Sequence, residues 1–312
     1  LLALRRDQGS ITMLRNVSSD GNLTGMTLSP DGHFLAAATG TGVAIFDIAK
    51  LTAGAPSPIV ASSDDGPHPG SIYAAFSPDG SLLFVANERS ASLSVYDASG
   101  LPAGLGKVGR IMVGVAPVGL AISPNGKYLY STSEVGPQNW PSKCTSEGPP
   151  HPEGLLLVID VAKAASDPAH ATLGGASAGC NPVRVALSAD GRTLYVTARG
   201  DNTLVRFDAA ELISDTAHAR PARIPVGMSP VGVIAIGNKV IVANSNRFGG
   251  GNHESLSVLN ASDLISRPFS IPAGSFPREL SVTPDKNTLV VTNFASGDLE
   301  LIDLRRLEQA VH

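Results

Sequence analysis

Short apolar runs of about six residues alternate with polar turns along the whole chain. The runs are rich in Val, Leu, Ile and aromatic residues, as in Leu82–Asn87, Thr193–Thr197 and Leu299–Asp303. Runs of this length, bounded by turn residues, are typical of β-strands. The chain contains 33 Gly and 23 Pro, which favours many turns and argues against long helices. The pattern therefore predicts an all-β protein.

One turn motif recurs at regular spacing. It consists of an apolar residue, Ser or Thr, Pro or Ala, Asp or Asn, and Gly or Lys, and its copies begin at Leu28, Phe76, Ile122, Leu187 and Val282. Successive copies are 48, 46, 65 and 95 residues apart. The last spacing equals two repeats, and a sixth copy, Val231–Ile236 with a shortened turn, lies between. Such self-similarity is the signature of a repeat architecture.

Each repeat contains four short apolar runs, here called strands a to d, and this pattern predicts one blade of a β-propeller. The chain is thus expected to be one propeller domain, residues 1–312, with six four-stranded blades. The approximate repeats are 20–66, 67–113, 114–174, 175–226, 227–272 and 273–304, and residues 11–17 complete the last. In this interpretation Ile11–Val17 pairs with Leu299–Asp303 and closes the last blade, which removes a free sheet edge. Residues 1–7 have no assigned place.

The repeat resembles a known family. Gly179-Cys180-Asn181-Pro182, followed by Leu194-Tyr195-Val196-Thr197, is similar to the YVTN repeat of lactonase-like propellers, whose blades are also WD40-like. That resemblance implies a β-propeller, commonly of seven blades, so a seven-bladed ring is the alternative to six. It specifies architecture better than function, because one scaffold hosts unrelated chemistries.

Charge and composition exclude several classes of partner. With 23 Lys and Arg against 27 Asp and Glu, the formal net charge is −4, and no basic run is longer than two residues. This argues against nucleic-acid binding. The apolar runs are far too short to cross a bilayer, so no membrane span is predicted. The chain begins with Leu rather than Met, which favours a processed chain.

The two cysteines, Cys144 and Cys180, fall on the same face of adjacent predicted blades. We predict a disulfide between them, with two unrelated thiols as the alternative. A disulfide would place the protein in an oxidising compartment, and we therefore expect a periplasmic or secreted protein.

Acidic residues that recur in every blade are expected to be structural. Asp31, Asp79 and Asp190 lie in the repeated turns, where Asp is favoured by its local hydrogen bonding. The c strands also end in Asp, which indicates capping of a corner; these residues are Asp47, Asp97, Asp160, Asp208 and Asp303. Functional residues should instead break the symmetry of the repeat.

Asymmetry is concentrated on the face that carries the d–a and b–c connections. The third blade has a long b–c loop, residues 133–154, and the fifth has another, residues 245–254, while that of the fourth, residues 198–202, is short. Two tall loops beside a low one predict a pocket. Arg184 enters strand a of the fourth blade and Arg199 follows its strand b.

These positions define the candidate site. As catalytic residues we predict Glu134, Arg184 and Arg199, and as ligand-binding residues His68, Glu88, Trp140, Arg247, His253, Arg278 and Glu279. A structural ion pair between Arg184 and Glu279 is the alternative for those two, since buried charges need partners. His68 could equally be a solvated loop residue. No metal-ligand spacing is present, so neither a metal nor a cofactor is predicted.

Two functions remain open. The resemblance implies that a His, an Arg and a Glu on successive blades bind a carboxylate and move protons during lactone opening. Arg184 matches the arginine, but Arg199 stands where the glutamate is expected and Gly119 where the histidine is expected. Glu134 or Glu88 would then act as acid and base, in a hydrolase or lyase acting on a small anionic molecule. The alternative is a non-catalytic exported propeller that binds a ligand or a protein partner.

Overall fold

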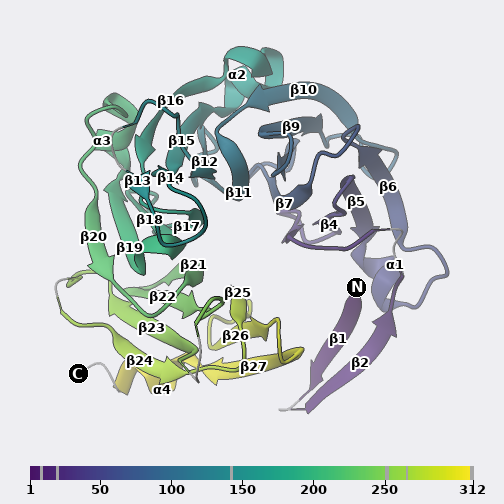
Figure 1. Ribbon diagram of the computed structural model, residues 1–312. Helices are drawn as coiled ribbons and strands as arrows, with labels where there is room; N and C mark the ends of the chain where they lie inside the picture. The colour runs from purple at the N-terminus through teal and green to yellow at the C-terminus, as the bar shows by residue number, and fades with distance from the viewer. Residues whose placement is uncertain (8–9, 19–20, 141–142, 250–252, 265, 310–312) are drawn as a thin grey trace. The chain divides into compact units, whose positions relative to one another are not determined.

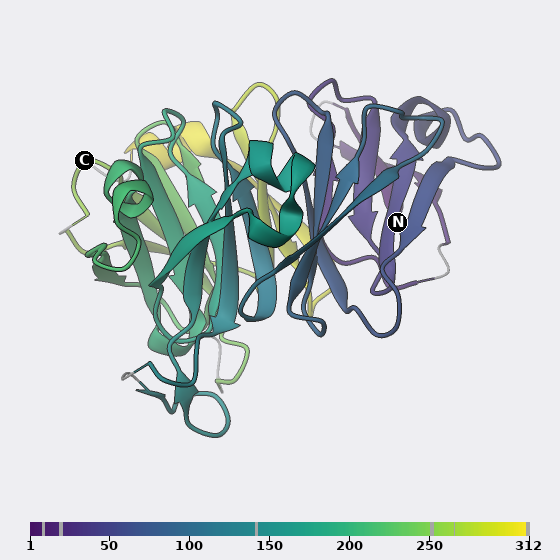
Figure 2. The same cartoon turned by 90° about the horizontal axis from the view of Figure 1, so that it is seen from above.

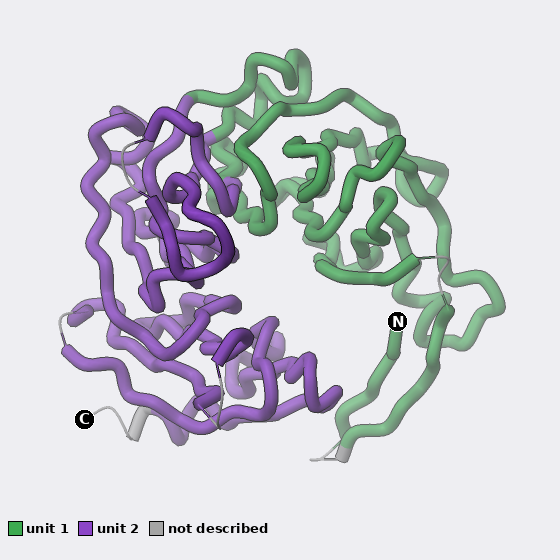
Figure 3. Tube along the Cα trace, in the orientation of Figure 1, with its two compact units in different colours: residues 1–130, 159–173 green, residues 131–158, 174–312 purple. Residues whose placement is uncertain are grey.

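A computed structural model describes residues 1–7, 10–18, 21–140, 143–249, 253–264 and 266–309. The fold is all-β, a β-propeller whose blades are antiparallel sheets (Figure 1). The chain divides into two compact units, residues 1–130 with 159–173 and residues 131–158 with 174–312 (Figure 3). We call them unit 1 and unit 2. Their boundary passes through the third blade.

Unit 1 contains an N-terminal hairpin, the first two blades and part of the third. The hairpin strands are β1 (Leu2–Asp7) and β2 (Ser10–Asn16). The first blade is formed by β3 (Met26–Leu28), β4 (Phe34–Ala38), β5 (Gly42–Asp47) and β6 (Ile59–Asp64), and the second by β7 (Ser71–Phe76), β8 (Leu82–Asn87), β9 (Ser92–Asp97) and β10 (Gly106–Met112). The short helices are α1 (Ile48–Thr52), α2 (Val161–Ser166) and η1 (Pro168–His170).

The third blade crosses the boundary and carries the long insertion. Its strands are β11 (Val115–Ile122), β12 (Tyr128–Val135), β15 (Leu155–Asp160) and β16 (Thr172–Ser177). The insertion between β12 and β15 contains a small two-stranded sheet, β13 (Lys143–Cys144) with β14 (His151–Pro152).

Unit 2 contains the remaining three blades. The fourth is formed by β17 (Pro182–Leu187), β18 (Thr193–Ala198), β19 (Thr203–Asp208) and β20 (Ala222–Pro225), and the fifth by β21 (Pro230–Ile236), β22 (Lys239–Asn244), β23 (Ser255–Asn260) and β24 (Phe269–Pro272). The last has three strands, β25 (Pro277–Val282), β26 (Thr288–Asn293) and β27 (Asp298–Asp303). The helices are η2 (Arg199–Asp201), α3 (Ala209–Ser214) and α4 (Leu304–Gln309).

The middle strands are buried on both faces. In β22, Ile241 and Ala243 pack in one apolar cluster with β26, while Val240 and Val242 pack in another with β18 and β19. Successive residues of a strand point to opposite faces, so one strand contributes to both cores. This is why the strand reads as a continuous apolar run rather than as an alternating one.

The repeated turns are held by their own side chains, as the sequence predicted. In each, the Ser or Thr hydroxyl donates to the carboxylate or amide oxygen of the Asp or Asn two residues on, at 2.5–2.7 Å. The same oxygen accepts the backbone N–H two residues further along the chain. The turn is therefore closed locally, and its Asp is structural.

The acidic ends of the c strands are helix caps or corner caps, which also agrees with the prediction. Asp47, Asp160 and Asp208 each accept the backbone N–H three residues on, at 2.9 Å, and so cap α1, α2 and α3. An N-cap of this kind satisfies a helix donor that would otherwise lack a partner.

The asparagine that ends strand b in three blades joins strand b to strand c. The Nδ2 groups of Asn87, Asn244 and Asn293 donate to a c-strand side chain in the same blade. All three asparagines are buried. A buried amide needs hydrogen-bond partners. The polar residue at the end of strand b is therefore matched by a polar partner on strand c.

The N-terminal segment differs from the sequence prediction. Residues 10–16 pair with Leu2–Asp7 in a hairpin of their own, and Leu1 and Val17 exchange backbone hydrogen bonds at its open end. Among the described strands, β27 is hydrogen-bonded to β26 alone. Closing a hairpin between neighbouring segments costs little loop-closure entropy. The sequence prediction assigns no place to residues 1–7, which contain the first strand of this hairpin.

Acid should weaken the repeated turns. Hydrogen bonds from the neighbouring Ser hydroxyl lower the pKa of Asp31, Asp79 and Asp190 in the folded chain. A depressed pKa contributes stability above the unfolded value of about 4, and this contribution is lost as the pH falls through the folded pKa. We therefore expect the melting temperature of the protein to decrease when the pH is lowered below about 4.

The control comes from the chain itself, because Asn125 already occupies the same turn position with the same hydrogen bonds. In the variant D31N/D79N/D190N, the drop in melting temperature between pH 7 and pH 3 should be smaller than in the parent. Equal drops would show that these carboxylates do not contribute.

Candidate functional site

A repeated backbone feature presents side chains at the d–a connections. Residues in a left-handed conformation directly precede a proline in five blades: His68, Ala116, Asn181, Ser229 and Phe276, with φ between 49° and 58°. Each is the third residue of a Gly-x-x-Pro sequence. Non-glycine residues rarely adopt positive φ, so the surrounding blade imposes this conformation.

In unit 2, each of these residues is joined to the first residue after strand b. The backbone N–H of Arg199, Ser245 and Phe294 donates to the carbonyl of Asn181, Ser229 and Phe276, respectively, at 2.8–3.1 Å. We call these three pairs the platforms of the fourth, fifth and sixth blades. The platforms share a backbone but differ in chemistry: charged and polar, small, and aromatic.

The fourth platform carries a buried arginine clamped by two carboxylates. The Nε and Nη2 groups of Arg199 donate to Glu147 at 2.8–3.0 Å, and Nη1 and Nη2 donate to Glu134 at 3.1 and 3.3 Å. Arg199 is only 8% exposed. Burial disfavours its charge, but the hydrogen bonds of Glu147 and the charges of both glutamates outweigh burial and raise the pKa of Arg199. With one cation and two anions, the cluster has a formal charge of −1.

The long insertion of the third blade supplies Glu147 and is fastened to the fourth blade. Cys144 and Cys180 form the predicted disulfide. Beside it, Arg223 pairs with Glu153 at 3.0 Å and with Asp201 at 3.1 Å. The insertion projects beyond the ends of the blade strands (Figure 2). Its position over the fourth platform therefore depends on covalent and ionic contacts rather than on an apolar core.

Gly200 permits this close approach. A Cβ atom at this position would lie 2.7 Å from Ser146 Oγ and 2.9 Å from Cys180 Cβ. Any larger residue would push the insertion away from η2, and with it the carboxylate of Glu147.

Arg184 makes a separate ion pair. It lies at the irregularity where β17 enters its sheet, between Pro182 and Val185, and its guanidinium donates to Glu279 of β25. The arginine is buried, and the glutamate side chain is 35% exposed. The bulge directs the side chain away from the regular strand direction. The structural ion pair that the sequence left as an alternative is thus present.

The b–c loop of the fifth blade reaches both neighbouring platforms. The Phe248 ring lies 5.8 Å from the Arg199 guanidinium carbon, and the Arg247 guanidinium carbon lies 5.1 Å from that ring and 5.9 Å from the ring of Phe276. Phe276 in turn packs edge-on against Phe294, with ring centroids 5.4 Å apart. The result is a continuous row of alternating cations and rings.

Part of this row is exposed to solvent. Phe248 is 61% and Phe294 64% exposed, and Arg278 lies over the Phe294 ring at 5.4 Å. Exposed aromatic residues beside arginines are the side chains that contribute most to binding interfaces. Among the described residues, Arg247 has ring partners but no carboxylate partner, so its donors face solvent.

The remaining predicted site residues are Trp140, His253, His68 and Glu88. Trp140 is half-buried near Gly136 and lines a hollow of about 570 Å³ with residues 175–177 and 216–221. His253 is exposed. His68 and Glu88 belong to unit 1, where His68 is exposed and Glu88 is half-buried.

Sequence reasoning missed Glu147 and the shared role of the platforms. It expected Arg184 and Arg199 in one pocket, whereas each has its own carboxylate partners. Glu147 could have been found from its position three residues after Cys144, since a disulfide holds its neighbours against the facing blade. In the described residues, no group of three or more potential metal ligands is arranged to hold an ion, and no helix is long and apolar enough to cross a bilayer.

Comparison with known proteins gives one family match. Residues 1–220 match the model of "Lactonase, 7-bladed beta-propeller". No curated protein matches the chain in sequence.

Solved structures share the fold at low identity. The periplasmic gluconolactonase of Pseudomonas aeruginosa is 19% identical, with a TM-score of 0.70 over 96% of this chain and 86% of its own. A Bacteroides uniformis protein, provisionally assigned as a 6-phosphogluconolactonase, is 14% identical, with a TM-score of 0.73 over 97% and 87%. The hydrazine synthase of Kuenenia stuttgartiensis is 18% identical, with a TM-score of 0.69 over 98% and 82%. These likenesses show a fold that serves unrelated functions.

Removing the disulfide should destabilise unit 2. For a loop of 36 residues, the chain-entropy model gives about 3–4 kcal/mol, and measured effects are commonly about 2–4 kcal/mol. We expect C144S/C180S to unfold at lower denaturant concentration than the parent. A thiol titration of the denatured, unreduced parent should find no free thiol, and two free thiols would contradict the assignment.

Loss of the Arg184 cation should also reduce stability. Arg184→Met leaves the Glu279 carboxylate without its partner, and we expect the free energy of unfolding to fall by about 2 kcal/mol. The double variant R184M/E279L should recover part of that loss, because it removes the stranded charge. If R184M melts like the parent but loses ligand binding, the arginine serves a ligand rather than the fold.

Proposed function

This chain belongs to the family of lactonase-type seven-bladed β-propellers, and on that premise we propose that it binds a small carboxylate-bearing molecule on the platforms of unit 2. The observation that supports this proposal is the exposed Arg247 guanidinium, held by two rings and without a carboxylate partner among the described residues. Arginine binds carboxylates through paired donors, so it is suited to receive the anion.

The aromatic rings supply the rest of the contact. Phe248, Phe276 and Phe294 offer flat apolar surface beside the cation. A sugar-like or cyclic ligand could place its apolar face on these rings while its carboxylate meets Arg247. The cation–ring contacts also restrict the arginine, which lowers the entropy lost on binding.

In this role, Arg199 is a positioning residue. Its donors are taken by Glu134 and Glu147, so it does not bind the ligand anion as the sequence analysis expected. It holds the two carboxylates beside the Phe248 ring instead. We therefore assign anion binding to Arg247 instead of to Arg184 and Arg199.

We further propose that the site opens lactones. Glu134 would act as general base and remove a proton from a water molecule that attacks the lactone carbonyl. Arg247 would hold the ligand and stabilise the negative charge that develops on the carbonyl oxygen. The ring C–O bond then breaks, and the released alkoxide takes up a proton to give the hydroxy acid.

A non-catalytic ligand-binding propeller is the second candidate. The observation that favours it is that both carboxylate oxygens of Glu134 accept from Arg199. Each of its oxygens is thus already engaged by a guanidinium group. The binding proposal holds for either candidate, whereas lactone opening requires Glu134 to accept a proton.

The disulfide supports an extracellular or periplasmic location. Such bonds persist in oxidising compartments and are rare in reducing ones. The fold likeness to a periplasmic gluconolactonase is compatible with that location.

Arg247→Met should abolish ligand binding without unfolding the chain, because the residue is exposed. Calorimetric titration with D-gluconate should show binding to the parent that is weakened by about tenfold or more in the variant. Arg192→Met is the matched control, since Arg192 is an exposed arginine in a turn of the same unit. D-Glucitol, which lacks the carboxylate, should bind far more weakly than gluconate.

Acid release during opening of D-glucono-δ-lactone, measured as the base needed to hold the pH constant, separates the two candidates. Above the spontaneous rate, the parent should accelerate opening and Glu134→Gln should lose at least about a hundredfold of that acceleration. Gluconate binding with no acceleration would identify the non-catalytic candidate. Equal affinity of the parent and R247M for gluconate would reject the proposed site.

A further inference from the structure

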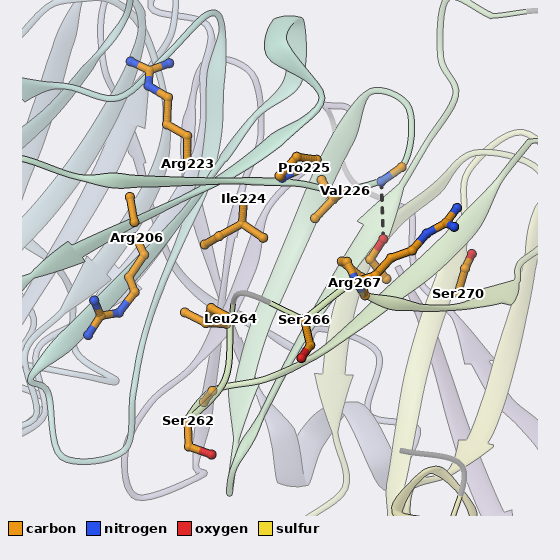
Figure 4. Close-up of a pocket in the computed structure, with 15 residues that line it drawn as sticks. Arg206, Arg223, Ile224, Pro225, Val226, Ser262, Leu264, Ser266, Arg267 and Ser270 are labelled. Carbon is orange, nitrogen blue, oxygen red and sulfur yellow. Dashed lines mark hydrogen bonds between the residues drawn. The ribbon is translucent and has the colours of Figure 1, made fainter. Parts of the chain in front are cut away.

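A second hollow lies at the outer strands of unit 2, away from the platforms. It measures about 960 Å³ and lies between β20 of the fourth blade and the segment from β23 to β24 of the fifth (Figure 4). Neither the sequence motifs nor the family resemblance assigns a role to it. Cavities that hold small ligands commonly measure about 300–1,000 Å³, so its size suits an organic molecule.

The centre of the hollow is apolar. Ile224, Pro225 and Val226 contribute from β20 and the residue after it, and Leu264 contributes from the loop of the fifth blade (Figure 4). We call these four residues the groove floor. Ile224 is buried in an apolar cluster against which Val226 and Leu264 pack, so the groove floor is continuous with the core between the fourth and fifth blades. Such a floor favours a hydrocarbon chain or ring.

The periphery is cationic. Arg206 and Arg267 line the hollow, and their guanidinium groups lie on different sides of the groove floor (Figure 4). Within the described residues, neither has a carboxylate partner; Arg206 lies beside the hydroxyl of Tyr195. Arg223 also lines the hollow, but it is engaged by Glu153 and Asp201. Two arginines that have no carboxylate partner in the described part of the chain therefore border the apolar floor.

Acidic groups nearby are committed elsewhere. Asp263 accepts both the backbone N–H and the hydroxyl of Ser266 within its own turn. Asp208 caps α3. The residues that line the hollow include three arginines and no acidic residue, whereas the whole chain has a formal net charge of −4.

We propose that this groove binds an amphipathic anion, an apolar chain or ring system with a carboxylate or phosphate headgroup. The apolar part lies on the groove floor, and the headgroup meets Arg267 or Arg206. The site is separate from the platforms, so its ligand and that of Arg247 bind independently. Charge complementarity excludes amphipathic cations, and the apolar floor disfavours small hydrophilic anions.

Calorimetric titration of the full chain with alkyl carboxylates below their micelle concentrations tests the proposal. Octanoate and decanoate should bind, and each added methylene should tighten binding by up to about fourfold until the floor is covered. Decyltrimethylammonium should bind at least about tenfold more weakly than decanoate. Decyl phosphate in place of decanoate identifies the preferred headgroup.

Three variants locate the site. The double variant R206M/R267M should bind decanoate about tenfold more weakly than the parent. Ser270→Trp, at an exposed position that lines the groove, should block binding without removing a charge. R192M serves as the control for loss of an exposed arginine, and R247M tests independence from the platforms.

The expected result is loss in R206M/R267M and S270W, with parent affinity in R192M and R247M. Equal binding of decanoate and decyltrimethylammonium, or unchanged decanoate binding in S270W, would overturn the proposal. Loss in R247M instead would assign the ligand to the platforms. Because gluconate binding is measured separately, failure here leaves the proposed function standing.

Discussion

Burial of both faces of middle strands such as β8 and β22 is the constraint on which the rest of this structure depends. Since Val240 and Ile241 point into different cores, neither face of β22 is available for chemistry. The same holds for β8, and polar side chains at the ends of the b strands are held by in-blade hydrogen bonds, as Asn87, Asn244 and Asn293 are. Chemistry on the middle strands is therefore confined to their ends and connections. There the Gly-x-x-Pro feature presents variable residues from a constant, strained backbone.

The platforms of unit 2 illustrate how one backbone supports different chemistry. Asn181 with Arg199 and Phe276 with Phe294 make the same backbone hydrogen bond, yet one pair is charged and the other aromatic. Between them, the fifth blade has only serines, which leaves room for Arg247 and Phe248 to contact both sides. Selectivity in this arrangement depends on side-chain choice and loop length rather than on rearrangement of the fold.

The arginines fall into two groups. Some form ion pairs that stabilise the fold, and others are available to bind a ligand. A buried charge requires partners, and the buried Arg184 and Arg199 have them. Exposed arginines such as Arg247 pay little desolvation energy and keep their donors for a ligand. Burial thus distinguishes the arginines that stabilise the fold from those that can bind a ligand. The residue type is the same in both groups and cannot make this distinction.

The sequence by itself determined the blade pattern, the repeated turns, the Asp caps and the cysteine pair, because each depends on local or periodic information. Turn and cap hydrogen bonds join residues two or three positions apart, and apolar runs at a constant spacing imply blades. Single-domain organisation stays a prediction, as do the roles of the individual site residues.

Only the tertiary structure decided which carboxylate each arginine meets. Arg199 and Glu147 are separated by 52 residues, and Arg184 and Glu279 by 95. Long side chains on different blades have many possible partners, and the blade geometry, the disulfide and the bulge at Arg184 select among them. The N-terminal hairpin was missed for the related reason that strand pairing depends on which edges meet, and apolar pattern alone does not specify that.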